Sequence, residues 1–586
     1  PSHNYQGISA LSGFQVSVLR YKRLLLGNFI CVFGFIILEL GLPTMLARMI
    51  DEGINTRRPD RIWFYGMVMV GVALIGLIGL IGLAYFASRI TTNVVRDMRD
   101  DIFARTIRFS HEEHNAVGTA SLITRTTNDA FQIMNFLQMI LRTGFMTPLM
   151  IIASAFLIVR TSPRLAWMVF AGIPLLLLGV WLIAVLSKPL SEKQQGNLDS
   201  INGRMREQLS GIRVIRAFVR EKFEQARFGE VNDAYANSSI KLFTLMAFAQ
   251  PGFSMVLNVI TGVIIWQGAV AIGQGQLAVG SLIAFIEYIF HVLFSFILFA
   301  SVFMMYPRAA VSAGRIEELL NAKNEIEGKD GQASRGRGAA GVVFDHVDFA
   351  YPGNSEAAVL HDISFSAQPG QTVAFIGSTG SGKSTLIQLI PRLFDVSAGR
   401  ILVTGTDVRD YAVKALRSKI GFVPQKAVLF TGTIADNLRY GAQEATDDDL
   451  WEALRIAQAA DFVREQPDGL QSILTEGGTN LSGGQKQRLA IARAIVRRPD
   501  IYIFDDSFSA LDYQTDAELR ANLAQVTQQA IVFIVAQRVG TIRHADQIVV
   551  LDNGELVGMG THEQLMATNP IYQEIARSQL SEEELA

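Results

Sequence analysis

The sequence predicts an all-α membrane domain followed by an α/β domain, and three observations support this fold class. Long apolar runs fill the first half of the chain, the composition changes sharply near residue 310, and short apolar runs separated by helical stretches follow. Hydrophobic residues make up 49% of the 586 residues and charged residues only 18%, a balance that a wholly soluble protein rarely shows. A chain of this length should hold more than one domain.

The first half is predicted to cross a membrane six times. Each apolar run approaches or exceeds the about 20 residues that a membrane helix needs, and buried helices of a soluble protein would carry polar faces at this length. The six expected spans are residues 24–46, 63–86, 145–159, 165–186, 245–272 and 279–306.

Basic residues predict the orientation of these spans. Arg20, Lys22 and Arg23 precede the first span, and arginine and lysine are concentrated between spans two and three and between spans four and five. The positive-inside rule therefore places the N-terminus and both long connections in the cytosol. Because these connections contain little proline, we expect helical extensions of the spans that turn near residues 118–128 and 210–220.

A glycine-rich loop follows the apolar run at residues 372–376. Its spacing, G-x-x-x-x-G-K-S, is typical of a phosphate-binding loop between a strand and a helix. Backbone N–H groups can crowd around phosphate oxygens there, Lys383 can reach the β- and γ-phosphates, and Ser384 can offer its hydroxyl to Mg²⁺. We therefore expect ATP or GTP to bind at Gly377, Ser378, Thr379, Gly380, Ser381, Gly382, Lys383 and Ser384.

The rest of the second half is typical of an α/β domain. Residues 363–367 alternate between apolar and polar, like a half-buried strand, and later apolar runs such as 501–504 are separated by helical stretches. The expected boundaries are residues 1–310 for the membrane domain, 311–341 for a linker and 342–586 for the nucleotide-binding domain.

A second anion site is predicted at Ser482, Gly483, Gly484 and Gln485, where a glycine-rich turn precedes a helix. One γ-phosphate cannot readily be held by two distant loops of a single chain. This second loop should therefore serve the nucleotide of another molecule.

Paired carboxylates, Asp505 and Asp506, end the apolar strand at residues 501–504 and are suited to holding Mg²⁺ and positioning a water. With these motifs in this order, the whole chain resembles the ATP-binding cassette (ABC) transporters, and more narrowly the half-size exporters. The resemblance implies six membrane helices with long cytosolic extensions, one α/β P-loop ABC nucleotide-binding domain, and ATP and Mg²⁺ as cofactors.

The resemblance also implies that ATP is held between the phosphate loop of one subunit and the 482–485 loop, the family's signature, of another. Further roles follow by position. Tyr351 would stack on adenine, Thr385 would join the phosphate loop, Gln425 would sense Mg²⁺, Asp505 would hold Mg²⁺ through water, Asp512 would lie at the dimer seam and Glu476 would touch a cytosolic hairpin.

Two positions depart from the family pattern. Asp506 stands where the family has glutamate as general base, and its carboxylate is set back by one methylene. Gln537 stands where the family has a histidine that contacts the γ-phosphate, and glutamine carries no titratable charge near neutral pH. Loss of either function could raise the barrier by several kcal/mol, and each 1.36 kcal/mol is tenfold in rate.

The signature loop, in contrast, matches the family. We therefore interpret the chain as the degenerate-site subunit of a bacterial heterodimeric exporter in the cytoplasmic membrane, similar to multidrug pairs. Its own site would bind ATP and hydrolyse it poorly. Its signature loop would complete the active site of a partner subunit that supplies the glutamate and the histidine.

The substrate is predicted only broadly. The last span is rich in aromatic residues and methionine, which suits amphipathic cargo, although lipid-facing or core packing explains most of them equally well. Glu287 and His291 lie one helical turn apart and could face a cavity or pair with one another. Like Glu39, they could attract cations or relay a proton. A lipid or lipopeptide flippase and a nucleotide-gated regulatory subunit stay open as alternatives. The formal charge of −2 gives no argument for nucleic acid.

Overall fold

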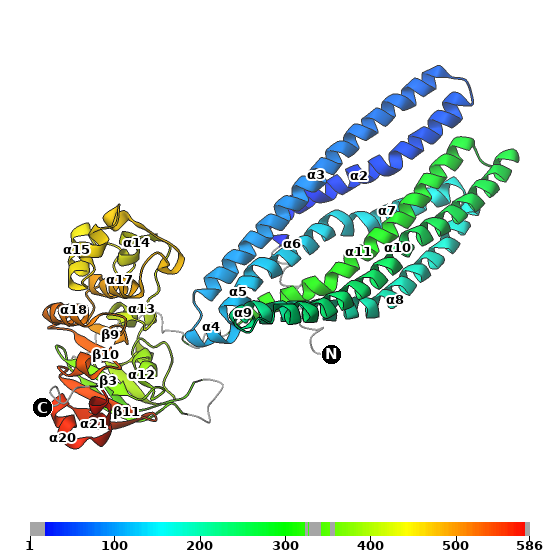
Figure 1. The fold of residues 1–586 in the computed structure, drawn as a ribbon. Helices are drawn as coiled ribbons and strands as arrows, with labels where there is room; N and C mark the ends of the chain where they lie inside the picture. The colour runs from blue at the N-terminus through cyan, green and yellow to red at the C-terminus, as the bar shows by residue number, and fades with distance from the viewer. Residues whose placement is uncertain (1–17, 323–325, 327–340, 352–357, 580–586) are drawn as a thin grey trace. The chain divides into compact units, whose positions relative to one another are not determined.

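The computed structural model describes residues 18–322, 326, 341–351 and 358–579, and most of the expected linker lies outside them. The chain divides into two compact units (Figure 1). The helical unit comprises Pro1–Arg105 and Ala120–Asn321, and the α/β unit comprises Thr106–Thr119 and Ala322–Ala586. The predicted fold class, a helical membrane domain followed by an α/β nucleotide-binding domain, is confirmed.

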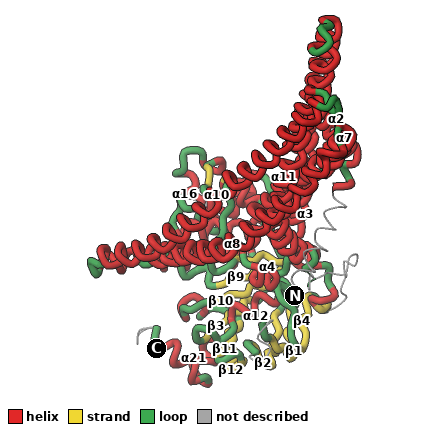
Figure 2. The backbone as a smooth tube through the Cα atoms, turned by 90° about the vertical axis from the view of Figure 1, so that its right-hand side faces the viewer, coloured by secondary structure: helices red, strands yellow, loops and turns green. Residues whose placement is uncertain are grey.

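The helical unit is built from long helices, drawn in red in Figure 2. Within the described residues, five helices are long and apolar enough to cross a membrane. The fourth expected span lies in α8, which opens with a shorter apolar stretch at Pro163–Leu175. The elements are α2 (Lys22–Arg48), η1 (Met49–Ile54), α3 (Pro59–Thr106), α4 (His111–Val117), α5 (Thr119–Thr124), η2 (Arg125–Asp129), α6 (Ala130–Met139), η3 (Ile140–Gly144), α7 (Met146–Thr161), α8 (Pro163–Ser210), α9 (Ile212–Ala217), α10 (Glu221–Gly273) and α11 (Val279–Leu320).

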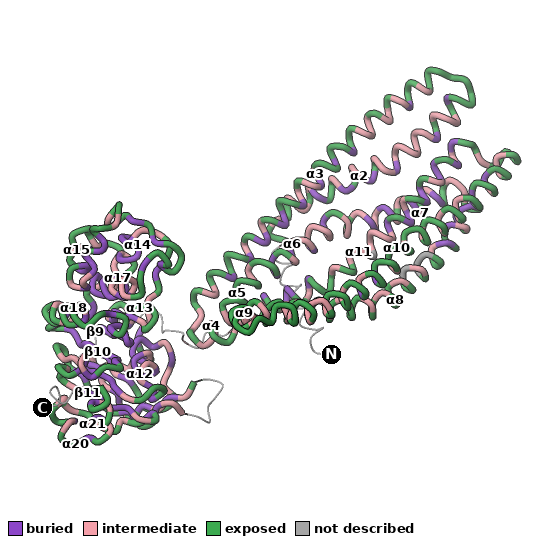
Figure 3. Tube along the Cα trace, in the orientation of Figure 1, coloured by how far each residue is buried: buried purple, intermediate pink, exposed green. Residues whose placement is uncertain are grey.

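Apolar side chains cover much of the outside of this unit, and Figure 3 shows few buried positions along α8 and α10. On α3, for example, Trp63 is 75% exposed and Met67 73%. An apolar surface of this extent is typical of lipid contact rather than contact with water. The internal core of this unit includes the buried side chains of Val32, Ile158 and Phe285.

Helices α2 and α3 approach each other backbone to backbone. A Cβ added at Gly79 would lie 2.9 Å from the Phe35 nitrogen and 3.0 Å from the Cys31 carbonyl oxygen. Gly34 occupies the facing position on α2. Small residues at such a crossing allow two membrane helices to pack at short range.

The first turn of α11 is capped by a carboxylate from far earlier in the chain. Asp51 of η1 accepts hydrogen bonds from the backbone nitrogens of Gly280, at 2.7 Å, and Ser281, at 3.1 Å. An acidic group at a helix N-terminus satisfies free N–H groups and complements the helix dipole. This contact joins the far end of α2 to the start of α11.

Three turns, η1, η2 and η3, are π-helical, which the apolar periodicity did not predict. The expected turn near residues 118–128 is also wrong, because the chain turns earlier, around α4. Ser110 and Glu113 form a capping box that starts α4, and Gly118, with φ of +76°, ends it. The second expected turn is confirmed, since α9 separates α8 from α10.

The α/β unit contains a parallel sheet with one antiparallel edge strand. Its strand order is β12-β11-β3-β10-β9-β6, and a second sheet has the order β2-β1-β4-β5. The strands are β1 (Val342–Phe349), β2 (Leu360–Ala367), β3 (Thr372–Gly377), β4 (Ala398–Val403), β5 (Thr406–Asp407), β6 (Ile420–Val423), β7 (Gly432–Thr433), β8 (Ile473–Leu474), β9 (Ile501–Asp505), β10 (Ile531–Val535), β11 (Gln547–Asp552) and β12 (Glu555–Gly560).

The helices of this unit pack on both sheets and complete two apolar cores. The alternation predicted within β2 is confirmed, with Ile363, Phe365 and Ala367 buried. The helical elements are α12 (Lys383–Leu389), η4 (Val408–Asp410), α13 (Val413–Ser418), α14 (Ile434–Arg439), α15 (Asp447–Ile456), α16 (Ala460–Arg464), η5 (Gly469–Gln471), η6 (Glu476–Gly478), α17 (Gly483–Val496), α18 (Tyr513–Val526), α19 (Val539–Ile542), α20 (His562–Thr568) and α21 (Pro570–Arg577).

Candidate functional site

The phosphate loop links the end of β3 to the start of α12, as predicted. Gly382 is left-handed, with φ of +91°, and a Cβ there would lie 2.6 Å from the Leu360 side chain. At Gly377 a Cβ would collide with the carbonyl oxygen of Leu551. Glycine is therefore required at both ends of a loop that also contains Ser378, Thr379, Gly380 and Ser381.

Lys383 lies folded into this loop. Its Nζ donates to the carbonyl oxygens of Gly377, at 2.9 Å, and Ser378, at 2.7 Å, and to Ser381 Oγ at 3.2 Å. Burial lowers the pKa of the Lys383 ammonium. The amine is thus held by neutral oxygen acceptors at the position where phosphates would be expected.

Two oxygen groups of the kind that Mg²⁺ prefers meet beside the loop. Ser384 Oγ donates to Asp505 Oδ1 at 2.7 Å. Burial, opposed by this hydrogen bond, raises the pKa of Asp505, and the neighbouring Asp506 charge raises it further. Among the described residues no group of three or more His, Cys, Asp or Glu could hold a metal. The pair still fits Mg²⁺, because nucleotide phosphates and waters usually supply most of its ligands.

Asp506 is held by two amides. Its Oδ2 accepts from Gln537 Nε2 at 2.9 Å and from Gln425 Nε2 at 3.3 Å. Burial raises the pKa of this carboxyl group, and the hydrogen bond from Gln425 opposes the shift. The backbone of Asp506 is left-handed, with φ of +47°, and its nitrogen donates to the Val535 carbonyl at 3.0 Å. The carboxylate therefore has little freedom to move toward a water.

Gln537 is fixed at both ends. Its side chain donates to Asp506, and its carbonyl oxygen accepts from Gln579 Nε2 at 2.8 Å. The structure thus brings together both positions that depart from the family pattern. Sequence reasoning placed each residue in the site but did not predict that they contact each other.

Tyr351 stands at the edge of an aromatic cluster. Its hydroxyl shares a hydrogen bond with Thr385 Oγ1 at 2.9 Å, and its ring lies 5.3 Å from that of Phe394 and 5.0 Å from that of Phe349. Phe394 also packs edge-on against His111 of α4, at 5.4 Å between ring centroids. No sequence motif singles out Phe394.

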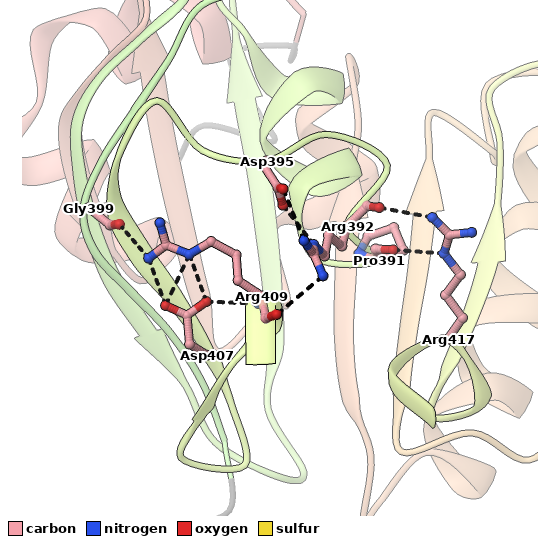
Figure 4. A network of polar contacts seen from close by, with 7 residues as sticks. All are labelled: Pro391, Arg392, Asp395, Gly399, Asp407, Arg409 and Arg417. Carbon is pink, nitrogen blue, oxygen red and sulfur yellow. Dashed lines mark hydrogen bonds and ion pairs between the residues drawn. The ribbon is translucent and has the colours of Figure 1, made fainter. Parts of the chain in front are cut away.

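A network of arginines fixes the turn that carries Phe394 (Figure 4). Arg392, buried and left-handed with φ of +51°, donates to both oxygens of Asp395, at 2.7 and 3.0 Å. Arg417 donates to the carbonyl oxygens of Pro391, at 3.0 Å, and Arg392, at 2.9 Å. Burial lowers the pKa of Arg417, and so does the charge of Arg392. Sequence reasoning missed this network, although Arg392 and Asp395 are spaced for an i,i+3 pair.

The signature loop begins α17. Ser482 Oγ accepts from the Gln485 nitrogen at 3.3 Å, and the Ser482 nitrogen donates to Gln485 Oε1 at 2.9 Å, which completes a capping box. Gly483 and Gly484 form the first turn. Asp512 caps α18 by accepting from the Thr515 nitrogen at 2.9 Å, and this bond lowers the pKa of Asp512.

In the helical unit, His291 lies near Glu39 rather than in a pair with Glu287. The distance from His291 Nε2 to Glu39 Oε2 is 3.5 Å. Glu287 is exposed on α11. The three ionisable groups singled out from the sequence therefore do not form one cluster of described contacts.

Comparison with known proteins decides the family. The model of the ABC transporter transmembrane region matches residues 25–297, and the ABC transporter model matches residues 360–509. An uncharacterised ABC transporter ATP-binding protein of Mycobacterium tuberculosis (strain CDC 1551 / Oshkosh) is 42% identical over 95% of this chain and 96% of its own length. The chain belongs to the ABC transporters. Its membrane region and single ATP-binding domain make it a half-transporter that couples ATP hydrolysis to transport.

Two further comparisons describe this ABC transporter's relatives. A putative multidrug export ATP-binding/permease protein of Bacillus subtilis (strain 168) is 31% identical over 90% of this chain and 92% of its own length. A bacterial Atm1-family ABC exporter, solved with ATP bound, is 24% identical and aligns with a TM-score of 0.75 over 98% of this chain and 99% of the other. The second likeness shows that the fold is shared.

Proposed function

We propose that this ABC transporter is one half of a heterodimeric exporter that moves amphipathic compounds across the bacterial cytoplasmic membrane. The chain would bind ATP at its own phosphate loop and hydrolyse it slowly. Its signature loop would complete the hydrolytic site of a partner that supplies the glutamate and histidine absent here. The name of the Bacillus subtilis relative supports multidrug-type cargo.

The observation that carries this proposal is the restraint of Asp506. A general base must lie within about 2.6–3.2 Å of the proton that it accepts, or reach it through water. Here the shorter carboxylate already accepts from the amides of Gln425 and Gln537. Both amides bond to Oδ2 and restrain a carboxylate that is already one methylene shorter than glutamate, so we infer that it orients an attacking water poorly. The capped Ser482 loop, in contrast, keeps its backbone N–H groups at a helix N-terminus, where an anion is favoured.

When Mg²⁺ is bound, it would neutralise charge that develops on the transferred phosphate. Lys383 would exchange its carbonyl partners in the loop for phosphate oxygens. Ser384 and Asp505 would orient the oxygens that hold the metal. Tyr351 would stack on the base, and its hydroxyl bond to Thr385 would tie that ring to the helix that follows the phosphate loop.

The test compares two substitutions in the chain purified with its partner. If the proposal is correct, Ser482→Ala lowers ATP hydrolysis by the heterodimer at least tenfold, because it damages the productive site. Asp506→Asn lowers hydrolysis less than twofold, because this chain's own site contributes little. The chain alone, or as a forced homodimer, should show little activity. Equal losses for both variants, or rapid turnover by the chain alone, would contradict the proposal.

A further inference from the structure

The helical unit contains a cavity of about 350 Å³ among α2, α3 and the continuous segment α6–η3–α7. This volume lies within the range of small-molecule sites, about 300–1,000 Å³. One wall is apolar and consists of Phe35, Leu80 and Leu83. The other wall consists of Asn135, Gln138, Met139, Arg142, Thr143 and Met146.

The second wall follows helical spacing. Its residues recur every three or four positions, so they lie on one face of the segment. Asn135, Gln138 and Thr143 supply hydrogen-bonding groups, and two methionines supply an adaptable apolar surface. Arg142 is the one charged residue among those that line this cavity. The cavity therefore combines an apolar side with a polar, cationic side.

A π-helical turn holds this cationic side in place. Arg142 and Thr143 lie within η3, Ile140–Gly144. Such turns are rare inside α-helices and frequent at functional sites. The neighbouring Leu141 is buried in a separate apolar cluster with Ala87, and its carbonyl oxygen accepts from Asn28 Nδ2 of α2 at 3.0 Å. The turn is thus anchored on the side of Leu141, and Arg142 is left to line the cavity.

The polar groups of the cavity wall have no partners within the described part of the chain. No hydrogen bond or ion pair there engages the side chains of Asn135, Gln138 or Arg142. Glu39, in contrast, already lies 3.5 Å from His291, and neither it nor Glu287 lines this cavity. Arg142 lies just before the third expected span, 145–159, and is exposed, so its guanidinium is open to a ligand. A guanidinium matches the planar or tetrahedral oxygens of carboxylate, sulfonate or phosphate.

We propose that this cavity binds an amphipathic anion. Arg142 binds the anionic head, Asn135 and Gln138 donate to its remaining oxygens, and the wall formed by Phe35, Leu80 and Leu83 packs on its apolar body. The assignment rests on the proposed export function and names the charge of the cargo. It favours anions over the cations that Glu287 and His291 suggested.

The experiment uses two dansyl probes that share one ring system and differ in the head, one ending in a sulfonate and the other in a trimethylammonium. ATP-driven uptake of each probe is measured with the heterodimer in inside-out proteoliposomes. Arg142→Gln should raise the KM for the sulfonate at least tenfold and leave the KM for the ammonium probe within twofold. Arg142→Lys should recover at least half of the lost sulfonate uptake, which a folding defect would not allow. Arg160→Gln, at the far end of α7, is the matched control and should behave as wild type.

A third arm separates a free anion from a lipid headgroup by following translocation of a fluorescent phosphatidylglycerol. Arg142-dependent movement of either the sulfonate or this lipid supports the anion site and identifies its source. An active heterodimer that moves neither, or an Arg142→Gln variant that affects both dansyl probes alike or neither, overturns the assignment alone. A complex without ATP hydrolysis above that of the separate chains instead contradicts the proposed function.

Discussion

Asp506 and Gln537 work as a pair, since the amide of one occupies the carboxylate of the other. We expect the double variant Asp506→Glu with Gln537→His to raise hydrolysis at this chain's own site at least tenfold. The added methylene carries the carboxylate toward the water, and histidine replaces the amide that restrains it. The measurement is ATP turnover by a heterodimer in which Ser482→Ala has weakened the partner's site.

The matched control is Asp506→Asn with Gln537→His, which supplies the histidine without a base. It should show no gain. If both double variants gain activity equally, the slow site does not result from the position of the carboxylate.

At the residue scale, the sequence predicts those parts of the site that are formed by residues adjacent in the chain. Residues 377–384 form the expected loop because strand, glycines and helix follow each other directly. His291 shows the limit. Its spacing from Glu287 suggested a partner one turn away, but the packing of α11 on α2 brings Glu39 to it instead. Contacts between distant segments carry no local signal.

Among elements, the turn after α12 depends on the buried guanidinium of Arg392 (Figure 4). Arg392→Ala should lower the free energy of unfolding of the α/β unit by about 2–4 kcal/mol, because Asp395 and the Arg409 carbonyl lose a charged donor. Hydrogen exchange of the amides in residues 398–410 measures this loss.

Arg400→Ala serves as the comparison. Arg400 pairs with Asp345 at 2.8 Å, but its side chain is 57% exposed, so water replaces the partner readily. We expect its effect on the unfolding free energy to stay below about 1 kcal/mol. Similar losses for both variants would show that the network does not support the turn.

The crossing of α2 and α3 gives a second prediction at this scale. Gly79→Ala should destabilise the helical unit by about 1–3 kcal/mol, because its Cβ would meet rigid backbone atoms of Cys31 and Phe35. A Cβ added at Gly71, on the same helix, would meet no neighbouring heavy atom within 4 Å. Gly71→Ala should therefore be neutral or slightly stabilising. Thermal unfolding of the purified chain in detergent compares the two. A loss of the same size at both positions would show that the close approach of α2 does not cause the effect at Gly79.

The apolar runs predicted where the helices lie but not how they bend. A hydrophobic run looks the same with or without a π-helical turn, so η3 and its contact with Asn28 were not predictable from periodicity. The capping box of Ser110 and Glu113, in contrast, is a sequence signal for the start of α4, and it lies before the turn expected near residues 118–128.

For the whole molecule, the segment Thr106–Thr119 interrupts the helical part of the chain yet belongs to the α/β unit. Its His111 meets Phe394, which in turn packs on Tyr351. We expect His111→Ala and Phe394→Ala each to reduce the stimulation of ATP hydrolysis by transported substrate about two- to tenfold, as the loss of one aromatic contact allows. The measurement is the ratio of stimulated to basal turnover in the heterodimer.

A double-mutant cycle makes this prediction specific. Because both rings form one contact, the double variant should be no worse than the more impaired single variant. His346→Ala, which removes an exposed histidine paired with Asp362 in the same unit, should leave the ratio unchanged. Additive losses would mean that the two rings act separately.

The cap on α11 also bears on how the chain is made. Asp51 is synthesised 229 residues before Gly280, whose backbone nitrogen donates a hydrogen bond to it. Until α11 is synthesised, the Asp51 carboxylate lacks its N–H partners. The backbone N–H groups of Gly280 and Ser281 become available only when the start of α11 leaves the ribosome. In a ribosome-bound chain that stops at Gly273, Asp51 therefore lacks the hydrogen bonds that join the end of α2 to α11. The helical unit therefore gains this contact only after α11 packs against the end of α2.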